Sequence, residues 1–411
     1  MIRAYPRHSS HLPKNWINFF LKCFLNRKLI HGNQIDTFNK SFSDFIGAPH
    51  SFSFIKARTA FIVLLNCLKL KPDDEILVSK LNFKPLIDII KLYQLKPVFV
   101  DIGTDSMIAP KHIEPLITAK TKALLLTHLY GDMCKIKDII HICEKNNLIA
   151  IEDAAQSFGA NIDGKYAGTF GKAGIFSLGQ GKTLNCFGGG VIVTNDNNLA
   201  HDIKISIQQL KSITPFYLFK IILKSIFLSL TTAKPIFSFL TFPIIKLMEL
   251  LSENKIDYLL DERYHNFCEH AVQKTSYIIS NFQATIGINN LYSINKELSR
   301  TIENSDFLTK QLMKIKYSIL LEHNDLVSTI LRSYFPIKVK NRSKIRRQLL
   351  SKGIDTQIPD LYYYSNSEDY PCEFINELLE IPFSKNYSKN ELVYIADTII
   401  KTLNENEIFN K

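Results

Sequence analysis

The segment LIAIEDAAQ, residues 148–156, decides the fold class of this chain. An apolar run ends in an acidic pair, and continuous apolar runs are typical of strands buried on both faces of a sheet. Similar runs are EILVS (75–79), PVFVD (97–101), ALLLTH (123–128), GIFSLG (174–179) and GVIVTND (190–196). Along the chain, the first four runs begin at residues 75, 97, 123 and 148. Helix-length amphipathic segments at 84–94, 110–119 and 135–146 separate them. The alternation predicts an α/β fold with a mostly parallel sheet.

The length and composition fit one large and one smaller globular domain. The chain has 411 residues, of which 46% are hydrophobic and 22% charged, which excludes collagen, coiled coil and wholesale disorder. Beyond about residue 275 the pattern predicts a small α/β domain. Its expected elements are a helical region opening at 280–294, a strand in 333–339, a basic helix near 343–352 and a helix from Glu391.

The charge balance indicates an anionic partner. The formal net charge is +11, which leaves nucleic acid, an acidic membrane surface and a phosphate-bearing substrate open. No nucleic-acid-binding module and no His/Cys metal spacing is recognisable, so we expect neither nucleic acid nor metal. The seven cysteines are scattered, and Lys22 interrupts the apolar part of the N-terminus. These features predict a reducing, cytoplasmic location without a secretory signal.

Two segments are apolar, aromatic and basic. No acidic residue precedes Asp36, and none lies between Asp202 and Glu249. The longest uncharged run, 235–245, is shorter than the roughly 20 residues of a transmembrane helix. Segments 12–30 and 215–248 therefore resemble helices lying in a membrane interface at the inner face of the cytoplasmic membrane, or helices that cover a dimer interface or core. The shared lack of acids slightly favours the membrane.

The expected organisation has four parts: a basic aromatic segment (1–30), a large domain (31–205), an apolar lysine-rich insertion (206–265), and an interface helix with the small C-terminal domain (266–411).

The residues between 153 and 190 carry the chemistry. Asp153 ends a predicted strand, where open α/β sheets bind ligands, and Ser177 and Lys182 flank a turn in FSLGQGKTLNCFGGG (176–190). Singly each signal is weak, because strand-end acids often cap helices and most lysines are solvated. Together they suit pyridoxal 5'-phosphate (PLP), which needs a carboxylate at its ring nitrogen, a lysine for the Schiff base and donors around its phosphate.

Several ordered motifs resemble the DegT/StrS family of PLP-dependent nucleotide-sugar aminotransferases. They are GDMCKIKDIIHICEKNNLIAIEDAAQSFGA (131–160), KYAGTFGKAGIFSLGQGK (165–182), NFQATIG (281–287), KGI (352–354) and LEIPFSKNYSKNEL (379–392). The resemblance implies the fold-type-I architecture, with a seven-stranded large domain and a small C-terminal α/β domain. It also implies a homodimer with active sites at the subunit interface.

The resemblance also implies roles for single residues. Lys182 would form the Schiff base and shuttle the proton, Asp153 would keep the ring nitrogen protonated, and Gln156 would contact the ring or its hydroxyl. Phosphate contacts would come from Ser177, from Thr59, and from the backbone N–H groups of Arg58 and Thr59 at a helix N-terminus. Phe83 would stack on the ring.

The chain departs from the family pattern at the phosphate. Ala57-Arg58-Thr59 stands where the family reads Ser-Gly-Thr, although Arg58 could pair the phosphate directly. Gln180-Gly181 replaces Pro-Thr before the lysine, and Ser276 corresponds to an Asn that the partner subunit sends to the phosphate. These changes indicate a divergent member.

The expected activity is transfer of an amino group from an amino acid, with glutamate as the expected donor, to a keto group on a nucleotide-linked sugar. The product would serve surface polysaccharide or lipopolysaccharide synthesis. A PLP-dependent sugar dehydratase is an alternative, but such relatives carry His where this chain has Lys182. A second alternative is a non-catalytic, membrane-associated relative with a structural or regulatory role.

Overall fold

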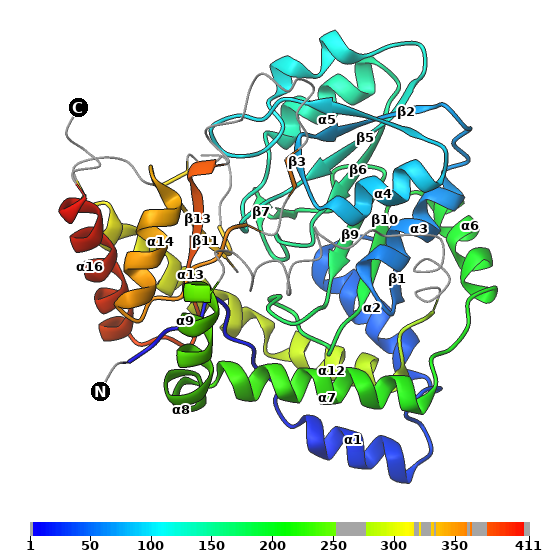
Figure 1. The fold of residues 1–411 in the computed structure, drawn as a ribbon. Coiled ribbons are helices and arrows are strands. Elements are labelled where there is room, and N and C mark those ends of the chain that lie inside the picture. The colour runs from blue at the N-terminus through cyan, green and yellow to red at the C-terminus, as the bar shows by residue number, and fades with distance from the viewer. Residues whose placement is uncertain are drawn as a thin grey trace.

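A seven-stranded sheet forms the centre of the large domain in the computed structural model (Figure 1). The structure describes residues 3–251, 277–315, 320–321, 330–332, 334–359, 362–363 and 376–406. The strand order is β1-β10-β9-β6-β5-β2-β4. The strands are β1 (His50–Phe54), β2 (Glu75–Ser79), β4 (Lys96–Val100), β5 (Thr121–Thr127), β6 (Ile149–Asp153), β9 (Ala173–Ser177) and β10 (Gly190–Thr194). The predicted α/β class and mostly parallel sheet are confirmed, because only the pairings of β10 with β9 and β1 are antiparallel.

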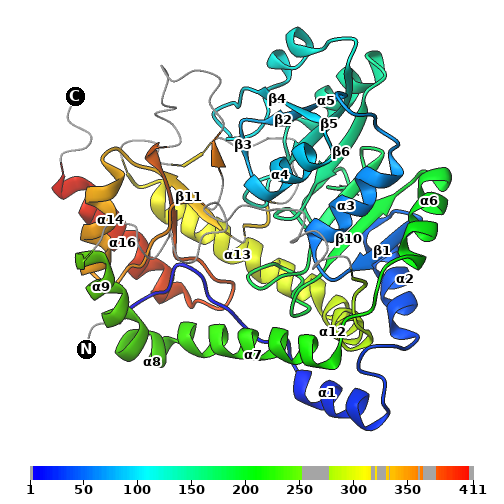
Figure 2. The same cartoon turned by 45° about the vertical axis from the view of Figure 1, so that its right-hand side comes forward.

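Helices cover both faces of the sheet (Figures 1 and 2). Successive residues of β5 point to opposite faces, so Leu124 and Leu126 join one hydrophobic cluster while Ala123 and Leu125 join the other. One face packs against α2 (Gln34–Ile46), α5 (Ile136–Lys145) and α12 (Asn281–Tyr292); the other packs against α3 (Ala57–Cys67), α4 (Lys84–Leu92) and α6 (Asn197–Gln208). Burial on both faces explains why the strands are continuously apolar in sequence.

The helix predicted at 110–119 is wrong. The structure has two single 3₁₀ turns there, at Pro110–His112 and Glu114–Leu116. Each turn has a proline at its first or second position. A second proline five residues after the first removes a backbone donor and clashes with the preceding turn, so a continuous α-helix cannot form.

The small domain is built on a two-stranded antiparallel sheet of β11 (Phe335–Lys338) and β13 (Leu378–Ile381). Side chains of α13 (Ile294–Leu312), α14 (Arg342–Ser351) and α16 (Lys389–Glu405) form one hydrophobic cluster with it. Minor strand pairs are β3 (Leu81–Asn82) with β12 (Tyr362–Tyr363), and β7 (Asn161–Ile162) with β8 (Lys165–Tyr166).

The N-terminal segment belongs to two places in the fold rather than one. Residues 3–13 contain no helix and run beside the small domain (Figure 2), where Tyr5 bridges Ile354 and His8 bridges Phe383. A bidentate ion pair of Arg7 with buried Asp355, at 2.8 to 3.1 Å, fixes this strand. Helix α1 (Trp16–Leu25) then packs on the large domain near α12.

The described part of the insertion, up to residue 251, contains α7 (Pro215–Thr232), α8 (Lys234–Ile236), the π-helical turn η3 (Phe237–Thr241) and α9 (Phe242–Leu251). Helix α7 starts sharply because Thr214 accepts a hydrogen bond from the Tyr217 N–H and Pro215 occupies the first turn. By length and composition alone α7 could cross a membrane: its mean hydropathy is 1.3 and 17% of it is buried in the protein.

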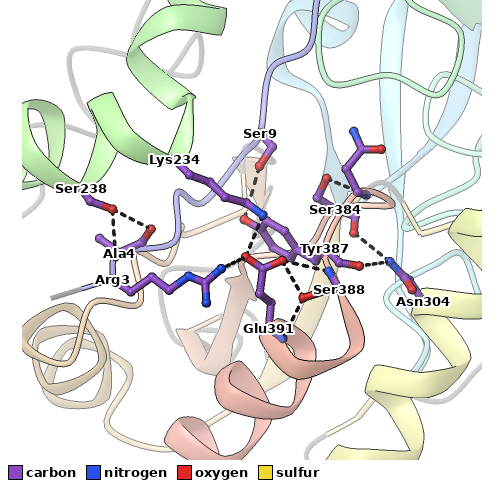
Figure 3. A network of polar contacts seen from close by, with 11 residues as sticks. Arg3, Ala4, Ser9, Lys234, Ser238, Asn304, Ser384, Tyr387, Ser388 and Glu391 are labelled. Carbon is purple, nitrogen blue, oxygen red and sulfur yellow. Dashed lines mark hydrogen bonds and ion pairs between the residues drawn. The ribbon is translucent and has the colours of Figure 1, made fainter. Parts of the chain in front are cut away.

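Glu391 connects the insertion, the N-terminal strand and the small domain (Figure 3). Its carboxylate accepts hydrogen bonds from Lys234 at 2.7 Å and Arg3 at 2.8 Å, and it also caps α16 through Ser388. Ser238 of η3 adds a hydrogen bond from the N–H of Ala4. Through Lys234, the α8 part of the insertion is therefore attached to the small domain.

Candidate active site

The carboxyl ends of three parallel strands form the floor of a cavity. β5 ends at Thr127, β6 at Asp153 and β9 at Ser177, and Thr127 lies opposite Asp153 in the ladder. The cavity has a volume of about 640 Å³. Six of the seven residues singled out from the sequence line it: Arg58, Phe83, Asp153, Gln156, Ser177 and Lys182. The seventh, Thr59, is 1% exposed in the first turn of α3, behind the wall.

Asp153 is a buried carboxylate at the centre of the floor. Its Oδ1 accepts a hydrogen bond from the Ala155 N–H at 3.0 Å. Burial raises the pKa of Asp153, and the Ala155 hydrogen bond and the positive charge of Lys182 oppose this only in part. A protonated ring nitrogen placed against this carboxylate would relieve the cost of its burial.

The N-terminus of α3 opens into the cavity. Its N-cap residue Lys56 makes no side-chain cap, and Lys56, Ala57 and Arg58 line the wall. The start of α3 can pack closely against β10 because residue 190 is a glycine. A Cβ at that position would lie 2.4 Å from the Ala57 nitrogen. Uncapped N–H groups at a helix N-terminus, with a guanidinium beside them, suit a phosphate.

Lys182 lies on the loop after β9, with its Nζ 5.1 Å from the centre of the Tyr334 ring. Tyr334 comes from the small domain and in turn packs edge-on against His8, 4.9 Å away between ring centres. The loop is held on its other side by Gln180, whose Nε2 donates to the Ser225 carbonyl of α7 at 3.1 Å. Both domains and the insertion therefore position this lysine.

Gln156 and His128 differ in what they can offer a ligand. The Gln156 Oε1 accepts the Tyr130 N–H at 3.0 Å, so its amide N–H groups are what it can direct to a ring or hydroxyl. His128 lines the cavity, but its Nε2 lies 3.0 Å from Glu152 and its Nδ1 accepts the Cys134 N–H at 3.2 Å. His128 therefore has a structural role, holding buried Glu152 beneath the floor.

Sequence reasoning missed a second set of lining residues. They come from the small domain and from α7: Tyr217, Lys220, Ile221, Lys224, Ser225, Leu228, Tyr334 and Glu380. On α7 these positions follow helical spacing, i, i+3, i+4, i+7, i+8 and i+11, which was visible in the sequence. The sequence did not reveal that this side of α7 faces the cavity.

The residues present fit PLP. The floor offers a buried carboxylate and a lysine, and the wall offers a helix N-terminus with Arg58. The Thr127 hydroxyl is buried and has no hydrogen-bond partner within the described residues, so a polar ligand group is expected beside it. The position of Ser276 lies outside the described residues, so its expected relation to the phosphate stays a prediction. No cluster of three or more His, Cys, Asp or Glu side chains in the described part of the chain could hold a metal ion.

Known proteins resemble this chain over part of its length. GDP-perosamine synthase of Escherichia coli O157:H7 is 34% identical over 169 residues, which cover 41% of this chain and 46% of that protein. The chain thus spans about half the length of the curated relatives it matches.

Two solved structures cover nearly the whole chain. Helicobacter pylori PseC, an aminotransferase involved in the biosynthesis of pseudoaminic acid, matches with a TM-score of 0.75 at 18% identity, over 98% of this chain and all of that one. The E. coli GDP-4-keto-6-deoxy-D-mannose-3-dehydratase with bound hydrated PLP matches with a TM-score of 0.73 at 18% identity, over 97% of this chain and all of that one. These matches confirm the fold-type-I architecture. Residues 13–212 match the DegT/DnrJ/EryC1/StrS aminotransferase family, which confirms the family resemblance over this half of the chain.

Proposed function

We propose that this protein is a PLP-dependent aminotransferase that moves an amino group from an amino acid, with glutamate as donor, to a keto group on a nucleotide-linked sugar. The observation that supports it is the convergence of Lys182, Asp153 and the N-terminus of α3 on one cavity at the strand ends. The match to an aminotransferase family and the similarity to the E. coli GDP-perosamine synthase support the same function.

Each residue has a distinct part in the proposed reaction. PLP, when bound, supplies an electron sink that makes a Cα–H bond of the donor acidic. Lys182 would accept that proton on its Nζ and donate it back later in the same half-reaction. Asp153 would keep a proton on the ring nitrogen, and Arg58 with the α3 N-terminus would hold the phosphate. Phe83 precedes α4 and lines the cavity wall, from where it would pack against the ring.

The proposal includes a membrane-associated enzyme. Apolar side chains are exposed along α1 and α7, two helices that run along one edge of the molecule (Figures 1 and 2), and along η3 and α9. They are Ile17, Leu21, Phe24, Leu25, Phe216, Phe219, Leu223, Phe227, Leu230, Phe239, Leu240, Ile244 and Leu247. Lysines accompany them on α1, α7 and α9, which suits an anionic lipid surface, and the acid Glu249 near the end of α9 is paired with Arg346.

Peripheral binding is favoured over a membrane span for α7. Its Leu218 and Ile222 are buried against the protein, and Lys220 and Lys224 line the cavity. Since one side of α7 is buried in the protein and a second side lines the cavity, only its third side can contact lipid. A homodimer, a cytoplasmic location at the inner membrane face and a role in surface polysaccharide or lipopolysaccharide synthesis complete the proposal.

The visible absorption spectrum of the purified protein with added PLP tests the function. We expect the wild type to show an absorption band of protein-bound PLP, distinct from that of free PLP. Lys182→Ala should abolish this band, and glutamate should bleach it in the wild type. Proton transfer alone accounts for about 10²- to 10⁴-fold of the rate, so Lys182→Ala should remove measurable transamination. A wild-type protein that forms no band with PLP would contradict the proposed function, and a band that glutamate leaves unchanged would contradict the donor.

A further inference from the structure

Helix α7 crosses the mouth of the cavity from the phosphate end to the lysine end. Near its start, Tyr217 interacts electrostatically with Arg58 of the α3 N-terminus. Two turns later, the carbonyl of Ser225 accepts the hydrogen bond from Gln180 beside Lys182. Lys220 and Lys224 lie between these two contacts, and both line the cavity while remaining exposed at its rim.

The three sides of α7 have different surroundings. One side is buried in the core through Leu218 and Ile222, and one lines the cavity. The third presents Phe216, Phe219, Leu223, Phe227 and Leu230 to the outside. The two lysines lie on the boundary between the cavity side and the outer apolar side, since Lys220 Nζ is 4.5 Å from the centre of the Phe216 ring.

We infer that Lys220 and Lys224 form a phosphate subsite for the amino acceptor, supplied by the same chain that supplies Lys182. This inference rests on the proposed function and names the acceptor chemistry: a keto sugar linked through phosphate. Two exposed cations one turn apart on one helix, at a cavity that Lys56 and Arg58 also line, give this rim a positive potential that attracts an anion. Helix α7 itself carries no acid.

The acceptor fits this subsite better than the cofactor does. The α3 N-terminus already offers backbone N–H groups and Arg58 to the cofactor phosphate inside the cavity. The α7 lysines are exposed at the rim, so they face a group that enters from outside. The phosphate could join the sugar to a nucleoside or to a lipid. The exposed apolar side of α7 next to the lysines would suit the chain of a lipid-linked sugar.

Equilibrium binding to the full-length protein tests the subsite with three probes. The variant is Lys220→Met/Lys224→Met, which keeps side-chain length and helix propensity, and the control is Lys204→Met, an exposed lysine on α6 outside both the cavity wall and the apolar segments. The first probe is GDP. The second is phosphatidylcholine vesicles carrying undecaprenyl phosphate, read against vesicles of equal charge carrying phosphatidylglycerol. The third is the ratio of PLP to pyridoxal affinity.

We expect the double variant to lose about tenfold or more of the affinity for GDP or for the undecaprenyl phosphate vesicles, which identifies the source of the phosphate. Lys220→Arg/Lys224→Arg should restore it, and the control should not differ from wild type. The PLP-to-pyridoxal ratio should stay unchanged.

The inference is overturned if that ratio falls, because the lysines would then serve the cofactor. It is also overturned if neither acceptor probe changes, or if GDP binding is unchanged while both kinds of charged vesicle lose affinity equally. The GDP and vesicle arms need no cofactor, so a failure of the proposed aminotransferase function would be seen separately, in the PLP spectrum.

Discussion

The floor and the α7 wall of the cavity are built in opposite ways. The floor groups stand at strand ends, where parallel register places Thr127 opposite Asp153 and burial is nearly complete. The wall is one helix whose lysines are exposed and whose outer side is apolar, with Phe227 65% exposed. The comparison suggests that the sheet determines the chemistry, while the insertion determines which molecules and surfaces reach it.

The largest effect after loss of the lysine is expected on the floor. Asp153→Asn should lower transamination about 10²-fold or more, because an amide cannot hold the ring nitrogen protonated. Steady-state kinetics with saturating PLP measures this. A variant that kept wild-type kcat would show that the floor carboxylate does not act on the cofactor.

The same change should stabilise the cofactor-free protein. Burial raises the pKa of Asp153, so the folded state holds this proton more tightly than the unfolded state does. Stability of the wild type should therefore fall as the pH rises from the ordinary range of an Asp through the raised value. Thermal unfolding without PLP should show Asp153→Asn to be more stable than wild type at neutral pH and free of this slope. A less stable variant would contradict the cost of the buried charge.

The wall should respond to changes that leave the floor untouched. Phe219→Gln/Phe227→Gln should weaken flotation with anionic liposomes at least tenfold, because burying a Phe side chain contributes roughly 1.5–3 kcal/mol. Met313→Gln, an exposed apolar residue on the adjoining turn after α13, is the matched control. Equal flotation of both variants would remove the membrane from the proposal.

The smallest effect is expected where the insertion meets the small domain. Burial would raise the pKa of Glu391, but its bonds with Lys234 and Ser388 lower it below the ordinary 4.5. Its contribution is therefore present above that pH and is lost as the pH falls through the lowered value. Glu391→Gln should cost about 1 kcal/mol at neutral pH, since Arg3 and Lys234 can be solvated in the variant.

Denaturant unfolding at neutral and acidic pH checks this, with Glu405→Gln as control. Glu405 lies on the same helix and pairs with Lys352 in an exposed position. A loss in Glu391→Gln that persisted unchanged at low pH would contradict the ionic origin of the effect.

The sequence was sufficient for the floor because each floor residue follows its own strand. Apolar runs of five to seven residues located six of the seven strands, and parallel strands bring their carboxyl ends to one edge. β1 escaped notice because HSFSF is half polar and lies at the sheet edge. Asp153, Ser177 and Lys182 could be predicted to meet without knowing any distance.

The wall could not be predicted because its residues are positioned by contacts between segments that are far apart in the sequence. Tyr334 reaches Lys182 only after the small domain packs against the large one, and no local pattern records that packing. The apolar stripe of α7 predicts an exposed or buried helix equally well. Which side of the helix faces the cavity depends on Tyr217 and Ser225 meeting partners some 45 to 160 residues away.

The N-terminal strand has a consequence for how the chain is made. Arg3 bonds Glu391, 388 residues later, and Arg7 bonds Asp355. Residues 3–7 must therefore wait, unpaired, until residues 355–391 have been synthesised, and such long loop closures are slow. These contacts of the small domain should therefore form only after residue 391 has left the ribosome, and the Arg3 and Arg7 ion pairs should be among the last contacts of the fold to close.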